Sequence, residues 1–262
     1  MKTFFSCIIL CLALFSCLSG QQAEQSTEIG IVEKLGDNVP VDLTFQDETG
    51  KEVTIKEVLQ KPTILALVYF RCPGICTPLL NGLRQVLDKV ALEAGKDFQI
   101  LTVSFNPEET SAMAAEKKKN YLSQLKRKIP ESSWRFLVGK EENVKKLTDS
   151  VGFYYQKEGR EYKHAATLTI LSPSGKITRY LYGVGFLPFD LKMALMEASE
   201  GKVGPTIAKF LEFCYSYDPK GKRYGLNVIR ISGAAVVIFL SIFILYLSFG
   251  GKKQLKKQEK GS

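Results

Sequence analysis

The chain has 262 residues, of which 45% are hydrophobic, and a formal net charge of +9. Five lysines and one glutamate in residues 252–262 account for +4 of that charge, and Lys2 for another +1. The +4 that remains is ordinary for the rest of the chain, so the composition excludes nucleic-acid binding from the expected functions.

The chain begins with the pattern of a secretory signal peptide. Lys2 is followed by an apolar run of about 15 residues and then by small and polar residues. We therefore predict a cleaved signal peptide at residues 1–20 and a polar tether at residues 21–38. Residues 14–17, LFSC, are loosely similar to a lipoprotein acylation signal, so a lipidated N-terminus stays open as an alternative.

The other end predicts a membrane anchor. Residues 231–251 carry no charge, and at about 1.5 Å per residue such a helix covers the roughly 30 Å of a bilayer's hydrocarbon core. We predict a juxtamembrane segment at 201–227, a transmembrane helix at 228–250 and a basic cytoplasmic tail at 251–262. The lysines after the span then place the bulk of the chain on the extracytoplasmic, periplasmic face.

Residues 39–200 predict one α/β domain. Alternating apolar and polar residues at 39–55 predict a β-hairpin that turns at Glu48-Thr49-Gly50. The apolar runs at 62–70 and 98–105 are typical of strands buried on both faces of a sheet. Between these runs, the apolar spacing is helical, with Thr77 and Pro78 expected as the N-cap and first turn.

The rest of the domain continues the alternation of helix and strand. We expect a charged helix at 108–128, a short strand at 134–138 and a helix at 141–152. A long polar and aromatic loop at 152–163, two strands joined by a turn at 164–183 and a closing helix at 188–199 follow. This order predicts a mainly parallel sheet with antiparallel additions. It is the layout of a thioredoxin-like fold with an N-terminal β-hairpin extension.

Three of the six cysteines lie outside the predicted signal peptide: Cys72, Cys76 and Cys214. An odd number in an oxidising compartment means that at least one thiol is unpaired, bound to metal or linked elsewhere. We expect Cys214 to be a structural thiol near the membrane. A role as exchangeable ligand, as resolving thiol or in an intermolecular disulfide stays open.

The segment Cys72-Pro73-Gly74-Ile75-Cys76 forms the predicted loop between a buried strand and a helix. Free N–H groups and the positive end of the helix dipole favour anionic sulfur there. A disulfide across so short a loop would stabilise the fold by about 2 kcal/mol or less, so stapling explains the pair poorly. Thiol–disulfide exchange and metal binding both remain open.

The chain contains one histidine, His164, at the start of the strand that follows the polar loop. A lone histidine in a loop is usually a solvated surface residue. In a thioredoxin-like sheet, however, this position lies on the same edge as the cysteine loop, so we expect His164 to meet Cys72 and Cys76. The spacing from Cys76 to His164 matches no zinc-finger pattern, and a structural zinc would need a fourth ligand. Two thiolates and one imidazole suit copper in both oxidation states.

Three segments, VYFRCPGICTPLLNGLRQVL, ILTVSFNPEET and KHAATLTILSPSGKITRYLYG, resemble the Sco/SenC family, and the resemblance covers residues 35–200. The resemblance implies a membrane-anchored, thioredoxin-like copper protein that helps to assemble cytochrome c oxidase. It also implies that Cys72, Cys76 and His164 are the copper ligands.

The chain departs from the more familiar members of that family in three respects. Gly74 stands where those members have an acidic residue, and Thr77 where they have proline. The predicted anchor is C-terminal here and N-terminal in them.

The sequence therefore predicts a copper chaperone for a respiratory oxidase. Its partners would be the copper subunit of the oxidase and a copper donor or thiol reductase. The alternative is a thiol–disulfide oxidoreductase with Cys72 and Cys76 as its catalytic pair, which would not need His164. A peroxidase-like function is disfavoured because the chain lacks the Thr-x-x-Cys arrangement, and a scaffold role requires a permanently oxidised pair.

Overall fold

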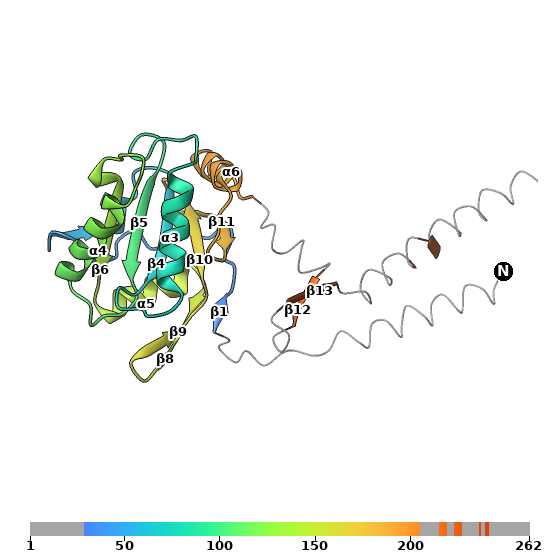
Figure 1. Cartoon of the computed structure of the whole chain (residues 1–262), viewed down its shortest axis with the longest axis horizontal. Coiled ribbons are helices and arrows are strands. Elements are labelled where there is room, and N and C mark those ends of the chain that lie inside the picture. The colour runs from blue at the N-terminus through green and yellow to red at the C-terminus, as the bar shows by residue number, and fades with distance from the viewer. Residues whose placement is uncertain (1–28, 205–214, 219–222, 227–235, 237–238, 241–262) are drawn as a thin grey trace, which may run out of the picture.

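The computed structural model describes residues 29–204, 215–218, 223–226, 236 and 239–240 (Figure 1). The predicted signal peptide, Cys214, the basic tail and nearly all of the predicted span lie outside these residues. Within the described ranges, no helix combines the length and the apolar character needed to cross a bilayer.

A seven-stranded sheet forms the centre of the domain. Its strands are β2 Thr44–Asp47, β3 Glu52–Thr54, β4 Thr63–Val68, β5 Gln99–Ser104, β6 Trp134–Val138, β10 Thr167–Leu171 and β11 Ile177–Tyr182. They stand in the order β11-β10-β4-β5-β6-β2-β3. β4, β5 and β6 are parallel, whereas β10 is antiparallel to β4 and β2 is antiparallel to β6. This arrangement confirms the expected thioredoxin-like sheet with a β-hairpin extension, β2–β3.

Helices pack against this sheet. They are α2 Ile55–Val58, α3 Cys76–Leu87, α4 Ser111–Ser123, α5 Glu141–Ser150 and α6 Pro188–Ser199, with a 3₁₀ turn at Glu131–Ser133. α3 contacts both α4 and α6, and in Figure 1 it crosses in front of the central strands. A separate pair of short strands, β12 Tyr215–Asp218 and β13 Arg223–Leu226, lies outside the main sheet.

The apolar pattern of the sequence explains the centre of this fold. All six residues of β4 are buried, as expected of a strand covered on both faces. The buried positions of α3 recur at helical spacing and include Leu79, Leu83 and Val86. Trp134 is fully buried, and its ring nitrogen donates a hydrogen bond of 2.9 Å to the hydroxyl of Thr102.

The start of α3 differs from the prediction. The helix begins at Cys76, and its N-cap is Ile75, which makes no side-chain cap hydrogen bond. The first helical hydrogen bond runs from the Leu79 N–H to the Ile75 carbonyl at 3.0 Å. The prediction of Thr77 as N-cap was therefore wrong, and Cys76 lies in the first turn of the helix and not in the loop before it.

The region predicted as a long loop at 152–163 contains strands. β7 Phe153–Tyr154 pairs with β1 Gly30–Ile31, and β8 Gln156–Glu158 pairs with β9 Glu161–Lys163 in a hairpin. The residues of this hairpin are nearly all exposed, so it lacks the apolar alternation that marks a strand in sequence. The helix predicted at 108–128 is also shorter than expected, since α4 ends at Ser123.

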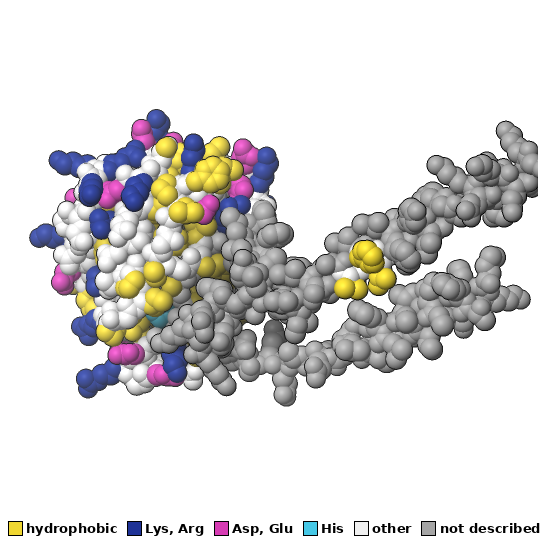
Figure 2. All heavy atoms as spheres, turned by 45° about the vertical axis from the view of Figure 1, so that its right-hand side comes forward, with side chains coloured by type: hydrophobic (Ala, Val, Ile, Leu, Met, Phe, Trp, Pro, Cys, Tyr) yellow, Lys and Arg dark blue, Asp and Glu magenta, His cyan; other side chains and the backbone are white. Residues whose placement is uncertain are grey.

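Part of the predicted tether packs on the domain. Besides the β1–β7 pairing, Gly36 N–H donates to the Ile177 carbonyl at 2.9 Å and Ile177 N–H donates to the Asp37 carbonyl at 2.8 Å. Residues 30–31 therefore extend the domain beside β7, and residues 36–38 extend it beside the start of β11. On the face seen in Figure 2, basic side chains of the described residues are interspersed with acidic and apolar ones and form no continuous stripe.

Candidate metal centre

The two cysteines lie at the junction between β4 and α3. Cys72 stands four residues beyond β4 in a turn closed by the hydrogen bond from its N–H to the Tyr69 carbonyl, 3.2 Å. Gly74 N–H donates to the Cys72 sulfur at 3.3 Å, and Tyr69 N–H donates to the Cys76 sulfur at 3.5 Å. Both thiols are free, and each sulfur accepts a backbone hydrogen bond.

The Cys76 thiol is deeply buried, with 3% of its surface exposed, against 9% for Cys72. Burial raises the pKa of Cys76 well above the usual thiol range, and the neighbouring charges of Cys72 and Glu109 act in the same direction. The hydrogen bond from Tyr69 opposes this shift without cancelling it. The expectation of a readily ionised thiol at the helix N-terminus is therefore wrong for Cys76, because burial disfavours its thiolate.

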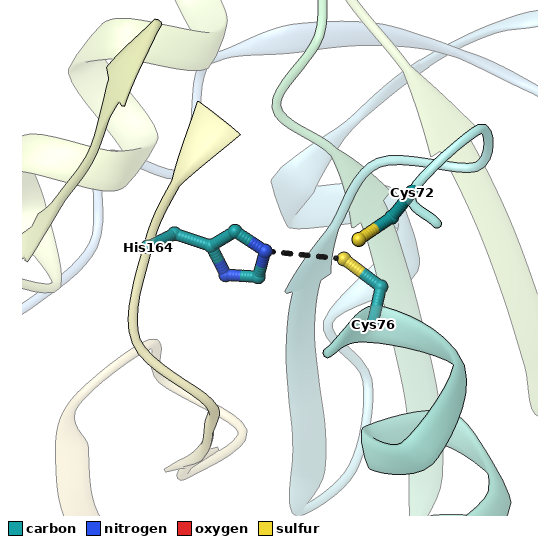
Figure 3. Close-up of side chains that lie close together, drawn as sticks. All are labelled: Cys72, Cys76 and His164. Carbon is teal, nitrogen blue, oxygen red and sulfur yellow. Dashed lines mark hydrogen bonds between the residues drawn. The ribbon is translucent and has the colours of Figure 1, made fainter. Parts of the chain in front are cut away.

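His164 directly follows β9, and its ring faces the two sulfurs (Figure 3). Nε2 lies 3.3 Å from the Cys76 sulfur, and Nδ1 lies 2.9 Å from the Ala165 carbonyl oxygen. Because a carbonyl only accepts, Nδ1 carries the ring hydrogen and the lone pair of Nε2 points at the sulfur. Burial lowers the pKa of His164, although the hydrogen bond to Ala165 opposes the shift, so the imidazole is neutral at pH 7.

Aromatic side chains enclose the imidazole. Its ring centroid lies 5.1–6.0 Å from those of three other rings: Phe105, Tyr69 and Phe153. The base of the β8–β9 hairpin is held in turn by Tyr162, whose hydroxyl donates to Asn106 Oδ1 at 3.2 Å. His164 is therefore held in place by packing against these rings as well as by its hydrogen bond to the Ala165 carbonyl.

The structure brings together the three residues that the sequence singled out. The two sulfurs and a ring nitrogen of His164 all lie within 4.8 Å of one another. A pocket of about 480 Å³ is lined by two of them, Cys72 and His164, together with Ile75 and Tyr162. Two soft sulfur donors and one imidazole nitrogen form a donor set that fits copper in either oxidation state.

Two further residues at the site were missed in the sequence. Tyr69 touches Cys76 through its backbone and His164 through its ring. Glu109 is 6% exposed and accepts hydrogen bonds from the backbone that leads to Cys72. Nothing in the apolar run around Tyr69 or in the acidic start of the predicted helix distinguishes these residues from their neighbours.

Comparison with known proteins adds a family relationship. A family model described as SCO1/SenC matches residues 33–185, more than half of the chain. The curated relative "Protein SCO1 homolog 1, mitochondrial" of Arabidopsis thaliana is 28% identical over 141 residues, which are 52% of this chain and 40% of the relative. The match thus spans less than half the length of that relative.

Solved structures share the fold. A candidate electron transfer protein from Aquifex aeolicus VF5 is 30% identical, with a TM-score of 0.58 over 64% of this chain and 96% of that one. Arabidopsis thaliana ScoI, solved with copper bound, is 24% identical, with a TM-score of 0.50 over 64% of this chain and 99% of that one.

Proposed function

The chain belongs to the SCO1/SenC family, and from this membership we propose that it is a copper chaperone that delivers copper to a respiratory oxidase during assembly. Proteins of the Sco family are cytochrome c oxidase assembly proteins. Copper is the metal of the site. The observation that carries the proposal is the convergence of Cys72, Cys76 and His164 on one point.

Each of the three side chains has a distinct part in holding the ion. The two thiolates bind Cu(I) strongly, and the imidazole makes Cu(II) acceptable as well. Copper must displace the proton that burial keeps on Cys76, whereas neutral His164 offers Nε2 without losing a proton. The hydrogen bond from Nδ1 to the Ala165 carbonyl holds the ring in the orientation that binding requires.

An incomplete ligand set suits transfer of the ion. Three protein ligands leave one side of a copper ion open to a ligand from another protein, in contrast to the closed set of a structural site. The pocket beside the cysteines provides the approach. We propose that a copper donor loads the site and that the copper subunit of the oxidase receives the ion there by ligand exchange.

The location of the domain is part of the proposal. A signal peptide at 1–20 and an anchor at 228–250 would hold the chain in the membrane with the copper site on the extracytoplasmic, periplasmic side. The uncharged run at 231–251 and the lysines that follow it support this orientation.

The copper site is tested with a His164→Ala variant. Anaerobic copper titration, with thiols counted before and after, should give one copper per wild-type chain and at least ~10-fold weaker binding in the variant, since one of three ligands is lost. The count of reactive thiols should not change. Lys163→Ala is the matched control, because Lys163 is exposed and adjacent. Equal copper affinity in the wild type and the His164→Ala variant would contradict the proposal.

A thiol–disulfide oxidoreductase is the second candidate. The free thiols of Cys72 and Cys76, side by side at the start of a helix, favour it. Cys72 would be the attacking thiol of such an enzyme, because it is more exposed than Cys76 and lines the pocket. A His164→Ala variant that still reduces a partner disulfide and binds copper like the wild type would favour this candidate.

A further inference from the structure

Glu109 is a buried carboxylate behind the cysteine loop. It lies between β5 and α4, and only 6% of its surface is exposed. Burying a carboxylate is costly unless hydrogen bonds replace the water that it loses. Its neighbour Glu108, in contrast, is exposed and forms a surface ion pair with Lys157. The burial of the Glu109 carboxylate therefore needs an explanation, whereas the exposed position of Glu108 does not.

Three donors surround the Glu109 carboxylate. Phe70 N–H donates to Oε2 at 2.6 Å, Arg71 N–H donates to Oε1 at 2.8 Å, and the Ser104 hydroxyl donates to Oε2 at 2.6 Å. The two backbone donors belong to the residues immediately before Cys72. One side chain thus joins the segment after β4 to the segment after β5.

The hydrogen bonds of the sheet do not join these two segments. The parallel pairing of β4 with β5 ends at Val68 and Ser104, followed by one hydrogen bond from Phe105 N–H to the Val68 carbonyl at 2.9 Å. Beyond that point, the N–H groups of Phe70 and Arg71 are satisfied by Glu109 and not by a strand. The path of the chain into Cys72 therefore depends on a side chain from the neighbouring loop.

We propose that Glu109 is a positioning residue of the metal centre: it fixes the backbone before Cys72. This inference rests on the proposed copper function. Hydrogen bonds to a carboxylate are short and directional, so they hold the Cys72 turn against Cys76 and His164. The ion itself is bound by the three ligands, which Glu109 does not touch.

The test compares Glu109→Gln with Glu108→Gln in the full chain. Both variants remove one negative charge and keep the side-chain volume, but only Glu109→Gln alters the hydrogen bonds to Phe70 and Arg71. Cu(I) affinity is measured anaerobically by competition with a chromophoric chelator, and the Cu(II) site by its sulfur-to-copper charge-transfer absorption. We expect at least ~10-fold weaker Cu(I) binding and a shifted absorption band for Glu109→Gln, and no change for Glu108→Gln.

A second variant covers the case in which Glu109→Gln does not fold. Glu109→Asp keeps the charge but shortens the side chain, so it should retain folding while losing contact with one of the two N–H groups. We expect its affinity to lie between those of the wild type and Glu109→Gln, with a shifted absorption band. Thermal unfolding of the metal-free variants separates this effect from a general loss of stability.

The outcomes separate the inference from the function on which it rests. A wild-type chain that binds no copper overturns the proposed function and the role of Glu109 together. A wild-type chain that binds copper, with unchanged affinity and absorption in both Glu109 variants, overturns the role of Glu109 alone. Equal losses in the Glu109→Gln and Glu108→Gln variants also overturn it, because they would indicate a long-range effect of net charge.

Discussion

Cys76 is both the first residue of α3 and a member of the candidate copper site. Its surroundings have opposite effects on the pKa of its thiol. The N-terminus of a helix favours the thiolate, whereas burial among apolar groups disfavours it. The raised pKa of Cys76 shows that burial is the stronger effect. Cys76 is therefore less readily ionised than an ordinary thiol, and a metal that binds its sulfur must replace the proton.

The reactivity of Cys76 should follow its pKa. Because only the thiolate is alkylated, we expect iodoacetamide to modify Cys76 more slowly at pH 7 than an ordinary thiol, and its rate to keep rising above pH 9, where an ordinary thiol is largely ionised. The measurement uses mass spectrometry of a metal-free Cys72→Ser variant over a pH series, with a short cysteine peptide as reference. A rate that reaches its plateau with the peptide would contradict the raised pKa.

At the scale of residues, the sequence predicted the side chains whose chemistry is unusual. A pair of cysteines and a single histidine are rare enough to be noticed, and their chemistry points to a soft metal. Glu109 and Tyr69 could not be found in this way, since glutamate and tyrosine are common and act here through position. Their roles depend on which backbone groups the sheet leaves without partners, and only the folded chain shows that.

At the scale of elements, α3 is held against the loop between β11 and α6. A Cβ atom on Gly82 would lie only 1.7 Å from the Val184 carbonyl oxygen. The helix that carries Cys76 therefore approaches this loop at its backbone, and glycine is the residue that permits the contact.

A Gly82→Ala substitution should destabilise the protein. We expect a net loss of about 1–3 kcal/mol in the free energy of unfolding, because the helix or the loop must move to admit the methyl group. Gly185→Ala is the control, since a Cβ there meets no atom within 4 Å and should change stability by less than about 1 kcal/mol. Urea unfolding measures both, and equal stability of the two variants would show that the loop moves aside freely.

The elements that the sequence predicted well are those whose burial requires a regular pattern of apolar residues along the chain. β4 and β5 lie in continuous apolar runs, and α3 has a clear apolar face. The β8–β9 hairpin could not be recognised, because its strands are exposed and its pairing does not depend on an apolar face. The end of α4 was likewise invisible, since charged residues continue past Ser123 without a break in pattern.

At the scale of the whole molecule, the site belongs to a domain that is complete within the described residues. The buried apolar cluster runs from Val39 to Ala198 and includes Cys72 and Cys76. Within residues 29–204, the end of the described range is tied to this domain by Gly204, whose N–H donates to the Thr178 carbonyl at 3.1 Å. The predicted anchor at 228–250 begins more than 20 residues later in the sequence.

A chain that ends after Gly204 should therefore fold and bind copper, but should no longer be held in the membrane. We expect the full-length chain in the membrane fraction and the shortened chain in the soluble periplasmic fraction, with equal copper affinity. Fractionation followed by copper titration of both proteins tests this. A full-length chain found in the soluble fraction would contradict the predicted anchor, and loss of cooperative unfolding on truncation would contradict the independence of the domain.

Cys76 and His164 lie 88 positions apart in the chain, so the complete three-donor site forms only when the sheet has folded. An unfolded chain lacks this site, and folding and binding of an ion by all three donors are therefore linked. An ion bound by all three side chains would link distant parts of the chain and oppose their separation. Release of that ion to a partner would therefore leave a chain that unfolds more easily than the metal-bound form.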